Sequence, residues 1–147
     1  MSLGEAWFEV EELIAASPAE LFPYLTEPDR YVRWMGVEAA LEAQPGGVYR
    51  VRMSNEAVAV GEFVEVVPSR RVVFTWGWSG NDAVPPGSTT VEITLEEQDG
   101  ATLVRLRHSG LPDEDARAQH GEGWRKYLGR LRILAAGSDP GPDVHPD

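Results

Sequence analysis

Apolar and polar residues alternate through the middle of the chain, from Val37 to His108. This period of two is typical of strands, in which successive side chains point to opposite faces of a sheet. A partial alternation near the N-terminus predicts one more strand, over residues 7–14. In the middle of the chain, the alternation predicts strands over residues 48–53, 58–67, 71–78, 91–95 and 102–108.

Two short helices are expected between the first strand and the others. Ser17 and Glu20 have the spacing of a capping box, in which each side chain bonds to the backbone of the other residue. Pro23 should keep this helix short or kinked, because proline lacks the backbone N–H that a helix interior needs. Pro28 ends it and is placed to open a second short helix that runs to Trp34.

One long helix is predicted near the C-terminus, from about Asp113 to Ala135. Its acidic residues come first and its basic residues late, which matches the helix dipole. Its apolar residues recur at helical spacing and form one stripe: Trp124, Tyr127, Leu128, Leu131, Leu134 and Ala135. A run of strands followed by one helix predicts an α+β fold, with a curved antiparallel sheet and the helix lying across it.

The chain has the length of one domain, with 147 residues and a mass of 16.2 kDa. We expect an ordered domain over residues 6–136. Residues 137–147 are rich in Pro, Gly and Asp, and we expect a flexible C-terminal tail there. Neither a signal peptide nor an apolar run of about 18 residues is visible, so we expect a cytoplasmic protein with no membrane segment.

Charge and composition exclude several classes of function. The net charge of −11 argues against a surface for nucleic acid or for anionic lipid. The absence of cysteine excludes disulfides, a thiol nucleophile and Cys-ligated metal. The sequence contains no close cluster of histidines and acids, no phosphate-binding loop and no dinucleotide fingerprint, so we expect neither a metal nor a cofactor.

Five segments, taken together and in this order, resemble a known family: IAASPAELFPYLTEPDRYVRWMG, PGGVYRVRM, GEFVEVVPSRRVVFTWGW, TTVEITLEEQDGATLVRLRHSGLP and HGEGWRKYLGRL. The chain resembles the START-like superfamily (also SRPBCC or Bet v-like) and, within it, the heat-shock protein 90 ATPase activator homologue (AHSA-like) group. The resemblance implies a helix-grip fold, in which about seven antiparallel strands wrap on a long C-terminal helix and enclose a hydrophobic cavity. The family name also implies a stress response and a co-chaperone role.

The residues that should line this cavity follow from the two periods. Those on the apolar faces of their strands share a parity, and those on the helix are four residues apart and so point the same way. The predicted ligand-binding residues are Met53, Phe74, Trp76, Ile93, His108, His120, Trp124 and Leu128. The loop over residues 79–88 is long for a hairpin, which fits either a functional lid or a passive solvated loop.

The function is left between three hypotheses. We favour a non-enzymatic carrier of a small hydrophobic or amphipathic molecule, with no catalytic residue, in which His108 and His120 are hydrogen-bonded partners at the pocket. The second is a cavity enzyme, a cyclase or hydrolase, with these two histidines as acid and base. The third is a protein-interaction module. A homodimer is left open.

Overall fold

The computed structural model describes residues 6–143. Within this range the chain forms seven strands and three helices. In chain order they are β1 (Trp7–Ile14), α1 (Pro18–Thr26), α2 (Pro28–Tyr31), β2 (Glu38–Leu41), β3 (Val48–Arg52), β4 (Val58–Val67), β5 (Arg71–Trp76), β6 (Thr89–Gln98), β7 (Ala101–Ser109) and α3 (Glu114–Ala135).

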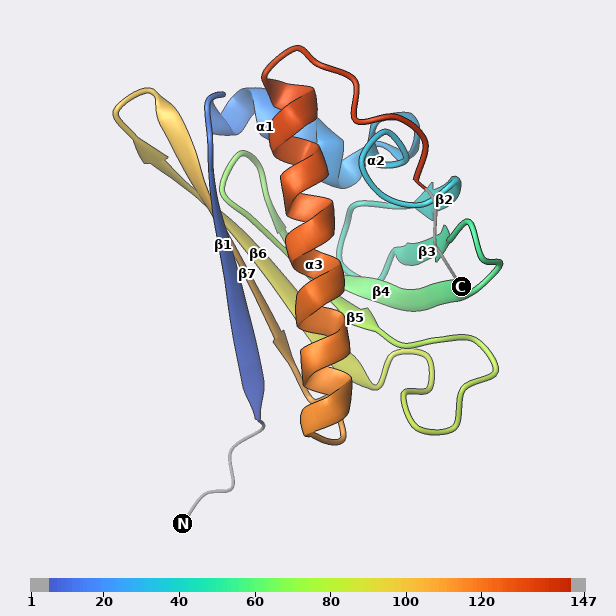
Figure 1. The fold of residues 1–147 in the computed structure, drawn as a ribbon. Helices are drawn as coiled ribbons and strands as arrows, with labels where there is room; N and C mark the ends of the chain where they lie inside the picture. The colour runs from blue at the N-terminus through green and yellow to red at the C-terminus, as the bar shows by residue number, and fades with distance from the viewer. Residues whose placement is uncertain (1–5, 144–147) are drawn as a thin grey trace.

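The strands form one antiparallel sheet in the order β1-β7-β6-β5-β4-β3-β2. Figure 1 shows this sheet curving around α3, which lies across its inner face, while α1 and α2 cover one end. The predicted α+β helix-grip fold is therefore confirmed. None of the helices within residues 6–143 is long and apolar enough to cross a membrane.

The core lies between α3 and the inner face of the sheet. The apolar stripe of α3 is buried there, including Leu128 and Leu131, which are fully covered. They face the alternate residues of the strands, such as Phe74 on β5 and Val104 on β7. The residues between them are mostly polar and point to the outer face of the sheet. The alternation in the sequence therefore determines which face of each strand the helix covers.

Helix α1 begins as its sequence predicts. The Ser17 side chain accepts a hydrogen bond from the backbone N–H of Glu20, and the Glu20 side chain accepts one from the backbone of Ser17. The helix runs for nine residues with Pro23 inside it. Several expected boundaries differ: α2 ends at Tyr31, before Trp34, β5 ends at Trp76, with Trp78 forming only an isolated bridge to Ala59, and β6 is longer than the expected 91–95. The short strand β2 is not among the strands expected from the sequence.

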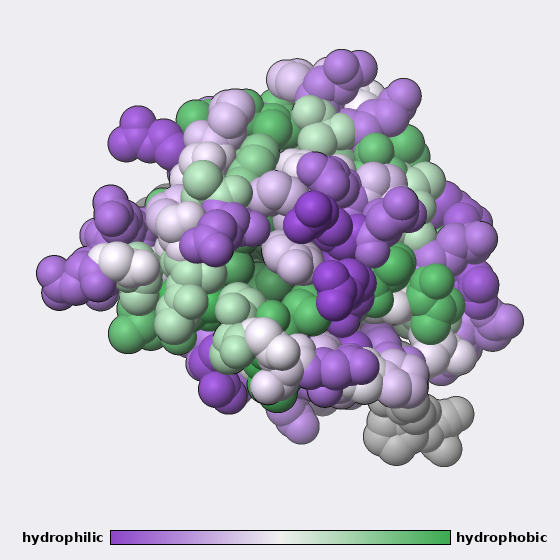
Figure 2. Space-filling view, turned by 90° about the horizontal axis from the view of Figure 1, so that it is seen from above, coloured by the Kyte–Doolittle hydropathy of each residue, from purple (hydrophilic) through white to green (hydrophobic). Residues whose placement is uncertain are grey.

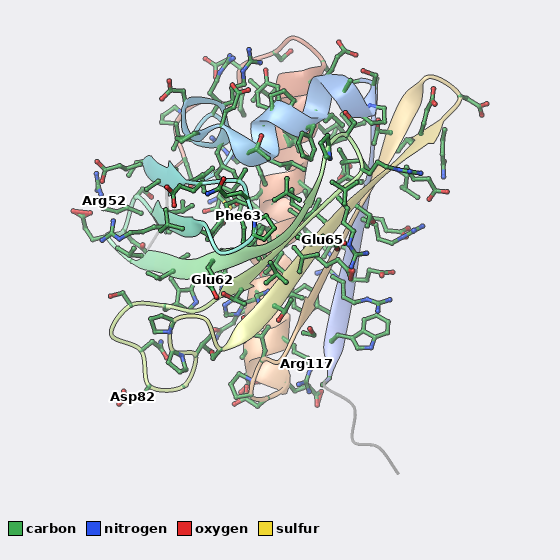
Figure 3. The ribbon with its side chains drawn as sticks, turned by 180° about the vertical axis from the view of Figure 1, so that it is seen from behind. Arg52, Glu62, Phe63, Glu65, Asp82 and Arg117 are labelled. Carbon is green, nitrogen blue, oxygen red and sulfur yellow. The ribbon has the colours of Figure 1, made fainter. Side chains whose placement is uncertain are left out.

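The outer face of the sheet is lined by ion pairs. On it, the Arg105 guanidinium lies 2.7 Å from a carboxylate oxygen of Glu11 and 3.6 Å from one of Glu96. Figure 3 views this side of the molecule, with Glu65 and Phe63 on neighbouring parts of β4, of which only Phe63 is buried against α3. Exposed pairs of this kind contribute little stability each, but they neutralise most of the arginines on this face.

Part of the tail expected to be flexible, over residues 137–147, contacts the domain in the structure. In residues 137–143, which we call the tail segment, Asp143 is buried. Its carboxylate accepts hydrogen bonds from the backbone N–H of Gly36 at 2.8 Å and from Lys126 at 3.2 Å. The remaining four residues of the expected tail, 144–147, lie outside the described residues.

Arg130 holds the same segment from the helix. Its guanidinium donates hydrogen bonds to the backbone oxygens of Pro140 and Gly141, at 3.2 and 2.8 Å. The segment thus contacts the domain through polar groups, of which the Asp143 carboxylate reaches a residue distant in sequence, Gly36. Seen from above, this end of the molecule shows hydrophilic residues interspersed with hydrophobic ones (Figure 2).

Replacing Asp143 should therefore destabilise the domain. In Asp143→Ala, the Gly36 N–H and Lys126 lose a buried acceptor, which should cost about 1–3 kcal/mol of unfolding free energy. For a chain of this size, this corresponds to a Tm lower by roughly 3–10 °C in a thermal melt followed by circular dichroism. Asp82→Ala, at the outer end of the β5–β6 loop (Figure 3), is the control and should change Tm little. An unchanged Tm for Asp143→Ala would show that the tail segment does not dock.

Candidate functional site

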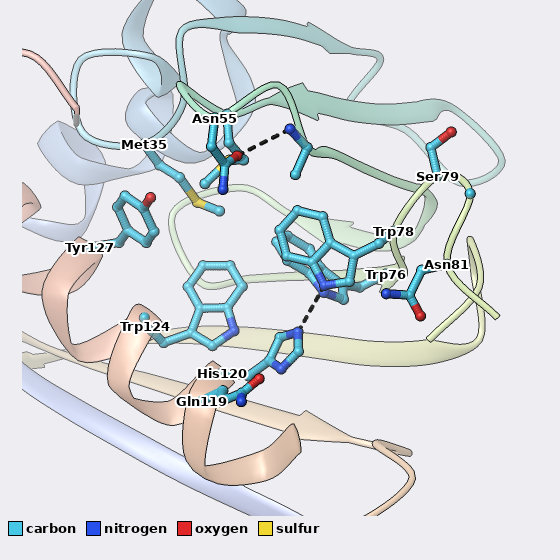
Figure 4. A pocket seen from close by; sticks show the side chains of 14 residues that line it. Met35, Asn55, Trp76, Trp78, Ser79, Asn81, Gln119, His120, Trp124 and Tyr127 are labelled. Atoms are coloured by element: carbon cyan, nitrogen blue, oxygen red, sulfur yellow. Dashed lines mark hydrogen bonds between the residues drawn. The ribbon is translucent and has the colours of Figure 1, made fainter. Parts of the chain in front are cut away.

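A cavity of about 540 Å³ opens between α3, the end of β5 and two loops. One loop joins β3 to β4, and the other joins β5 to β6. Figure 4 shows aromatic side chains on its walls and amide side chains nearer the loops. The lining residues are Met35, Met53, Asn55, Ala57, Trp76, Trp78, Ser79, Gly80, Asn81, Gln119, His120, Gly123, Trp124 and Tyr127.

Backbone hydrogen bonds tie the β5–β6 loop to the sheet and close it on itself. Ser79 N donates to Val58 O of β4 at 2.9 Å, and Trp78 N donates to Val84 O within the loop at 2.7 Å. Gly77 allows this loop to fold back, because a Cβ there would lie 1.8 Å from the backbone oxygen of Pro85. This side of the rim is therefore anchored to β4.

Trp76 is the centre of an aromatic cluster at the cavity wall. Its ring centroid lies 5.1 Å from those of both Trp78 and Trp124, with the Trp78 ring nearly perpendicular. The rings of His108 and His120 follow at 5.9 and 6.4 Å. Such edge-to-face contacts stabilise the rings beyond their buried area and keep them in defined positions.

His120 is bonded through both of its ring nitrogens. Its Nδ1 lies 2.8 Å from the backbone oxygen of Ala116, which can only accept, so Nδ1 carries the proton. Its Nε2 accepts a hydrogen bond from the indole N–H of Trp78 at 3.0 Å (Figure 4). Burial lowers the pKa of His120, so the ring is neutral at pH 7.

His108 is also bonded through both ring nitrogens, and it is more deeply buried than His120. Its Nδ1 accepts from the indole N–H of Trp124 at 3.1 Å. Its Nε2 lies 2.9 Å from the hydroxyl of Thr89, and that hydroxyl donates its own proton to the backbone oxygen of Trp76, so Nε2 must be the donor. Burial, together with nearby His120, lowers the pKa of His108 to about 3.

These bonds limit what the two histidines can do chemically. A general base needs a free lone pair, and a general acid needs a proton that it can release to substrate. In both rings the lone pair is taken by a tryptophan N–H and the N–H is taken by an oxygen acceptor. The geometry therefore holds both imidazoles neutral and engaged, as structural parts of the wall.

The eight predicted ligand-binding residues fall into two groups. Met53, Trp76, His120 and Trp124 line the cavity. The other four are buried in the core but are not among its lining residues: Phe74, Ile93, His108 and Leu128. The alternation along a strand identifies which residues face α3. Whether such a residue lines the cavity or packs in the closed core depends on its position along the strand.

The sequence pattern does not identify the polar residues at the site. Asn55, Ser79 and Asn81 lie on loops and carry no periodic signal, and Gln119 lies on α3 outside its apolar stripe. The length of the loop over residues 79–88 was the one available hint, and its first residues do border the cavity. Within residues 6–143, the structure places no group of three or more His, Asp or Glu side chains where they could hold a metal ion.

Comparison with known proteins identifies relatives over most of the chain. The sequence model of the family described as Activator of Hsp90 ATPase homolog 1-like protein matches residues 15–136. The activators of 90 kDa heat shock protein ATPase homolog 1 from Mus musculus and Homo sapiens are each 28% identical over 120 residues. Those residues are 80% of this chain but 33% of each relative, so the chain spans about a third of their length.

Solved structures agree with the sequence match. The solution structure of an AHSA1-like protein from Rhizobium etli is 49% identical, with a TM-score of 0.76 over 97% of this chain and 89% of that one. The solution structure of an Aha1 dimer from Colwellia psychrerythraea has the same TM-score at 22% identity, over 88% of this chain and 96% of that one. The latter likeness supports the fold alone.

The buried neutral His108 should make stability depend on pH. The folded state protonates it only near pH 3, whereas the unfolded chain does so near 6.5, so protons favour unfolding below about 6.5. Between about pH 7 and pH 5, this one group should remove about 1–2 kcal/mol of unfolding free energy. Urea unfolding at both pH values should show a smaller loss in His108→Gln than in the unmodified chain. Equal losses would mean that His108 is not held neutral.

Proposed function

Because the chain belongs to the Activator of Hsp90 ATPase homolog 1-like family, within the START-like fold, we propose that it is a binding protein rather than an enzyme. It takes a small apolar or amphipathic molecule into the cavity between α3 and the sheet. The ligand lies against Trp76 and Trp124, with Met35 and Met53 filling the space around it. In this proposal the protein acts in the cytoplasm.

The observation that carries the proposal is the cavity itself. Its volume of about 540 Å³ is in the range of small-molecule sites, and its walls are mostly aromatic and apolar with a few amides. Flexible methionine side chains adapt to ligands of irregular shape. Apolar side chains that face an open cavity contact water, and a ligand that covers them removes this surface from water, which is favourable.

The enzyme hypothesis has less support from the same residues. Both histidines have their lone pairs occupied by indole N–H groups, and reaching either as a base would first require breaking one of these bonds. Burial also lowers the pKa of both, which makes them poor proton acceptors near neutral pH. We therefore assign no catalytic residue.

The names of the relatives suggest a different role. Two of them are called activators of the 90 kDa heat shock protein ATPase, but this chain matches only a third of their length. A co-chaperone role in a stress response would need a surface for a partner protein. We rank it below ligand binding, because the cavity is the feature of the described residues that is built for an occupant.

A neutral fluorescent probe tests the cavity. N-phenyl-1-naphthylamine should bind with increased emission, because it leaves water for an apolar site. Trp124→Ala should weaken this binding about 5-fold or more, since it removes one aromatic wall. Trp7→Ala is the matched control, because Trp7 is 51% exposed on β1 and is not among the lining residues. Its affinity should equal that of the unmodified chain.

Two results would contradict the proposal. The first is the absence of saturable binding by this probe and of any co-purified small molecule in native mass spectrometry. The second is an equal loss of affinity in Trp7→Ala and Trp124→Ala, which would place the probe away from the cavity.

We extend the proposal to a homodimer. A structural neighbour from Colwellia psychrerythraea is described as a dimer, and this chain exposes Trp7 and Leu13 on the edge strand β1. Pairing would cover these apolar side chains and an open strand edge. Light scattering after size exclusion should then give twice the chain mass of 16.2 kDa. A mass of one chain at all concentrations tested would exclude the dimer.

A further inference from the structure

The polar groups around the cavity are not balanced between donors and acceptors. Asn55 and Asn81, the only asparagines of the sequence, both line it. The side-chain oxygen of Asn55 accepts the backbone N–H of Ala57 at 3.1 Å. That of Asn81 accepts the backbone N–H groups of Ala83 and Val84, at 2.9 and 2.8 Å. Each oxygen is thus used inside its own loop.

These bonds fix which end of each amide faces the cavity. Since a backbone N–H can only donate, the atom that receives it must be the amide oxygen, and the NH₂ group is the other end. In Figure 4 the nitrogen of Asn55 points toward the middle of the cavity, and that of Asn81 points toward the tryptophans. Neither NH₂ group bonds to any residue in the range 6–143.

The imidazole acceptor of the wall, by contrast, is already taken, and the tyrosine proton is used outside the cavity. His120 receives the indole N–H of Trp78, and the hydroxyl of Tyr127 is directed to Asp143 at 3.3 Å. The indole N–H of Trp76 is buried and has no acceptor among the described residues. Ser79 and Gln119 can donate or accept and so do not change the balance. At the rim, the NH₂ groups of Asn55 and Asn81 are therefore N–H donors without a balancing acceptor from the same side chains.

The wall also lacks charge. Among the described residues that line the cavity, none carries a full charge, because His120 is neutral there. The chain around it has a net charge of −11, which repels an anionic ligand. A cationic ligand would find no carboxylate on the wall to pair with it, and burying an unpaired charge is costly.

We propose that the ligand is an uncharged, largely apolar molecule with a carbonyl-type oxygen, and that an amide NH₂ group of the rim, that of Asn55 or that of Asn81, donates a hydrogen bond to that oxygen. This inference rests on the proposed cavity function and adds its selectivity. The apolar body of the ligand lies against Trp76 and Trp124, and its oxygen lies at the loops.

Two flat probes of nearly equal shape distinguish selectivity for a carbonyl oxygen from general binding of apolar molecules in the cavity. Fluorene and 9-fluorenone differ at one position, where a methylene in the first is a carbonyl in the second. Tryptophan fluorescence should be quenched by both if the cavity binds flat apolar molecules. The carbonyl should make 9-fluorenone bind about 3- to 10-fold more tightly, the gain typical of one neutral hydrogen bond.

The double variant Asn55→Asp/Asn81→Asp tests the donors without removing the loop bonds. A carboxylate oxygen still accepts the backbone N–H groups, so both turns can form. The NH₂ donors are replaced by acceptors, so the advantage of 9-fluorenone over fluorene should disappear. Gln44→Glu/Gln98→Glu adds the same two charges away from the cavity and should keep the advantage.

A measurement on the unmodified chain gives an independent readout. The side-chain NH₂ signals of at least one of the two asparagines should shift in ¹⁵N–¹H spectra when 9-fluorenone binds, and should shift much less with fluorene. Equal affinities for the two probes, with unshifted NH₂ signals, would overturn the selectivity and leave the cavity function standing. A failure of both probes to quench would contradict the cavity function and this inference together.

Discussion

Two hydrogen bonds from tryptophan to histidine hold the site together. One joins Trp124 of α3 to His108 of β7, and the other joins Trp78 of the β5–β6 loop to His120 of α3. Each links two elements across the inner face of the sheet, and each satisfies a polar atom that burial would otherwise penalise. Since an indole N–H can only donate, both imidazoles must present a lone pair to it and therefore stay neutral. The same bonds thus position the aromatic wall and remove the histidines from acid–base chemistry.

The inner face of the sheet is covered by closely packed side chains at one end and borders the cavity at the other. At one end Tyr49 and Phe74 stack with centroids 4.0 Å apart, and the hydroxyls of Tyr49 and Tyr31 bond at 2.5 Å. Burial raises the pKa of both tyrosines, so neither ionises near neutral pH and this end is a closed, neutral core. Toward the end of β5 the rings of Trp76, Trp78 and Trp124 still contact one another, but they border the cavity. The indole N–H of Trp76 is buried there without an acceptor among the described residues.

The sequence predicts the fold well because its signals are periodic. Parity along the strands and the spacing of four on α3 identify the inner face, and they place Trp76 and Trp124 on it. The same parity cannot distinguish Trp76, at the cavity, from Phe74, in the solid core, because both are apolar and two residues apart. Asn55 and Asn81 escape detection for another reason: loops have no period, and the role of an asparagine depends on which backbone groups its oxygen meets. The probe experiments with 9-fluorenone address the part of the site about which the sequence is silent.

The contacts of the tail segment could not be predicted from the sequence either. They also involve residues next to the cavity. A stretch rich in Pro, Gly and Asp has no apolar surface to bury, so composition alone predicts flexibility. What docks it are polar contacts: the guanidinium of Arg130 on its backbone oxygens, and the carboxylate of Asp143, which reaches the backbone of Gly36 and the hydroxyl of Tyr127. Gly36 follows Met35 in the chain, and both Met35 and Tyr127 line the cavity. Burial, with the nearby Asp143 carboxylate, raises the pKa of Tyr127, so its hydroxyl keeps its proton and can remain the donor. One wall of the cavity is therefore held in place by a residue close to the C-terminus, and its shape depends on contacts between segments more than 100 residues apart in the chain.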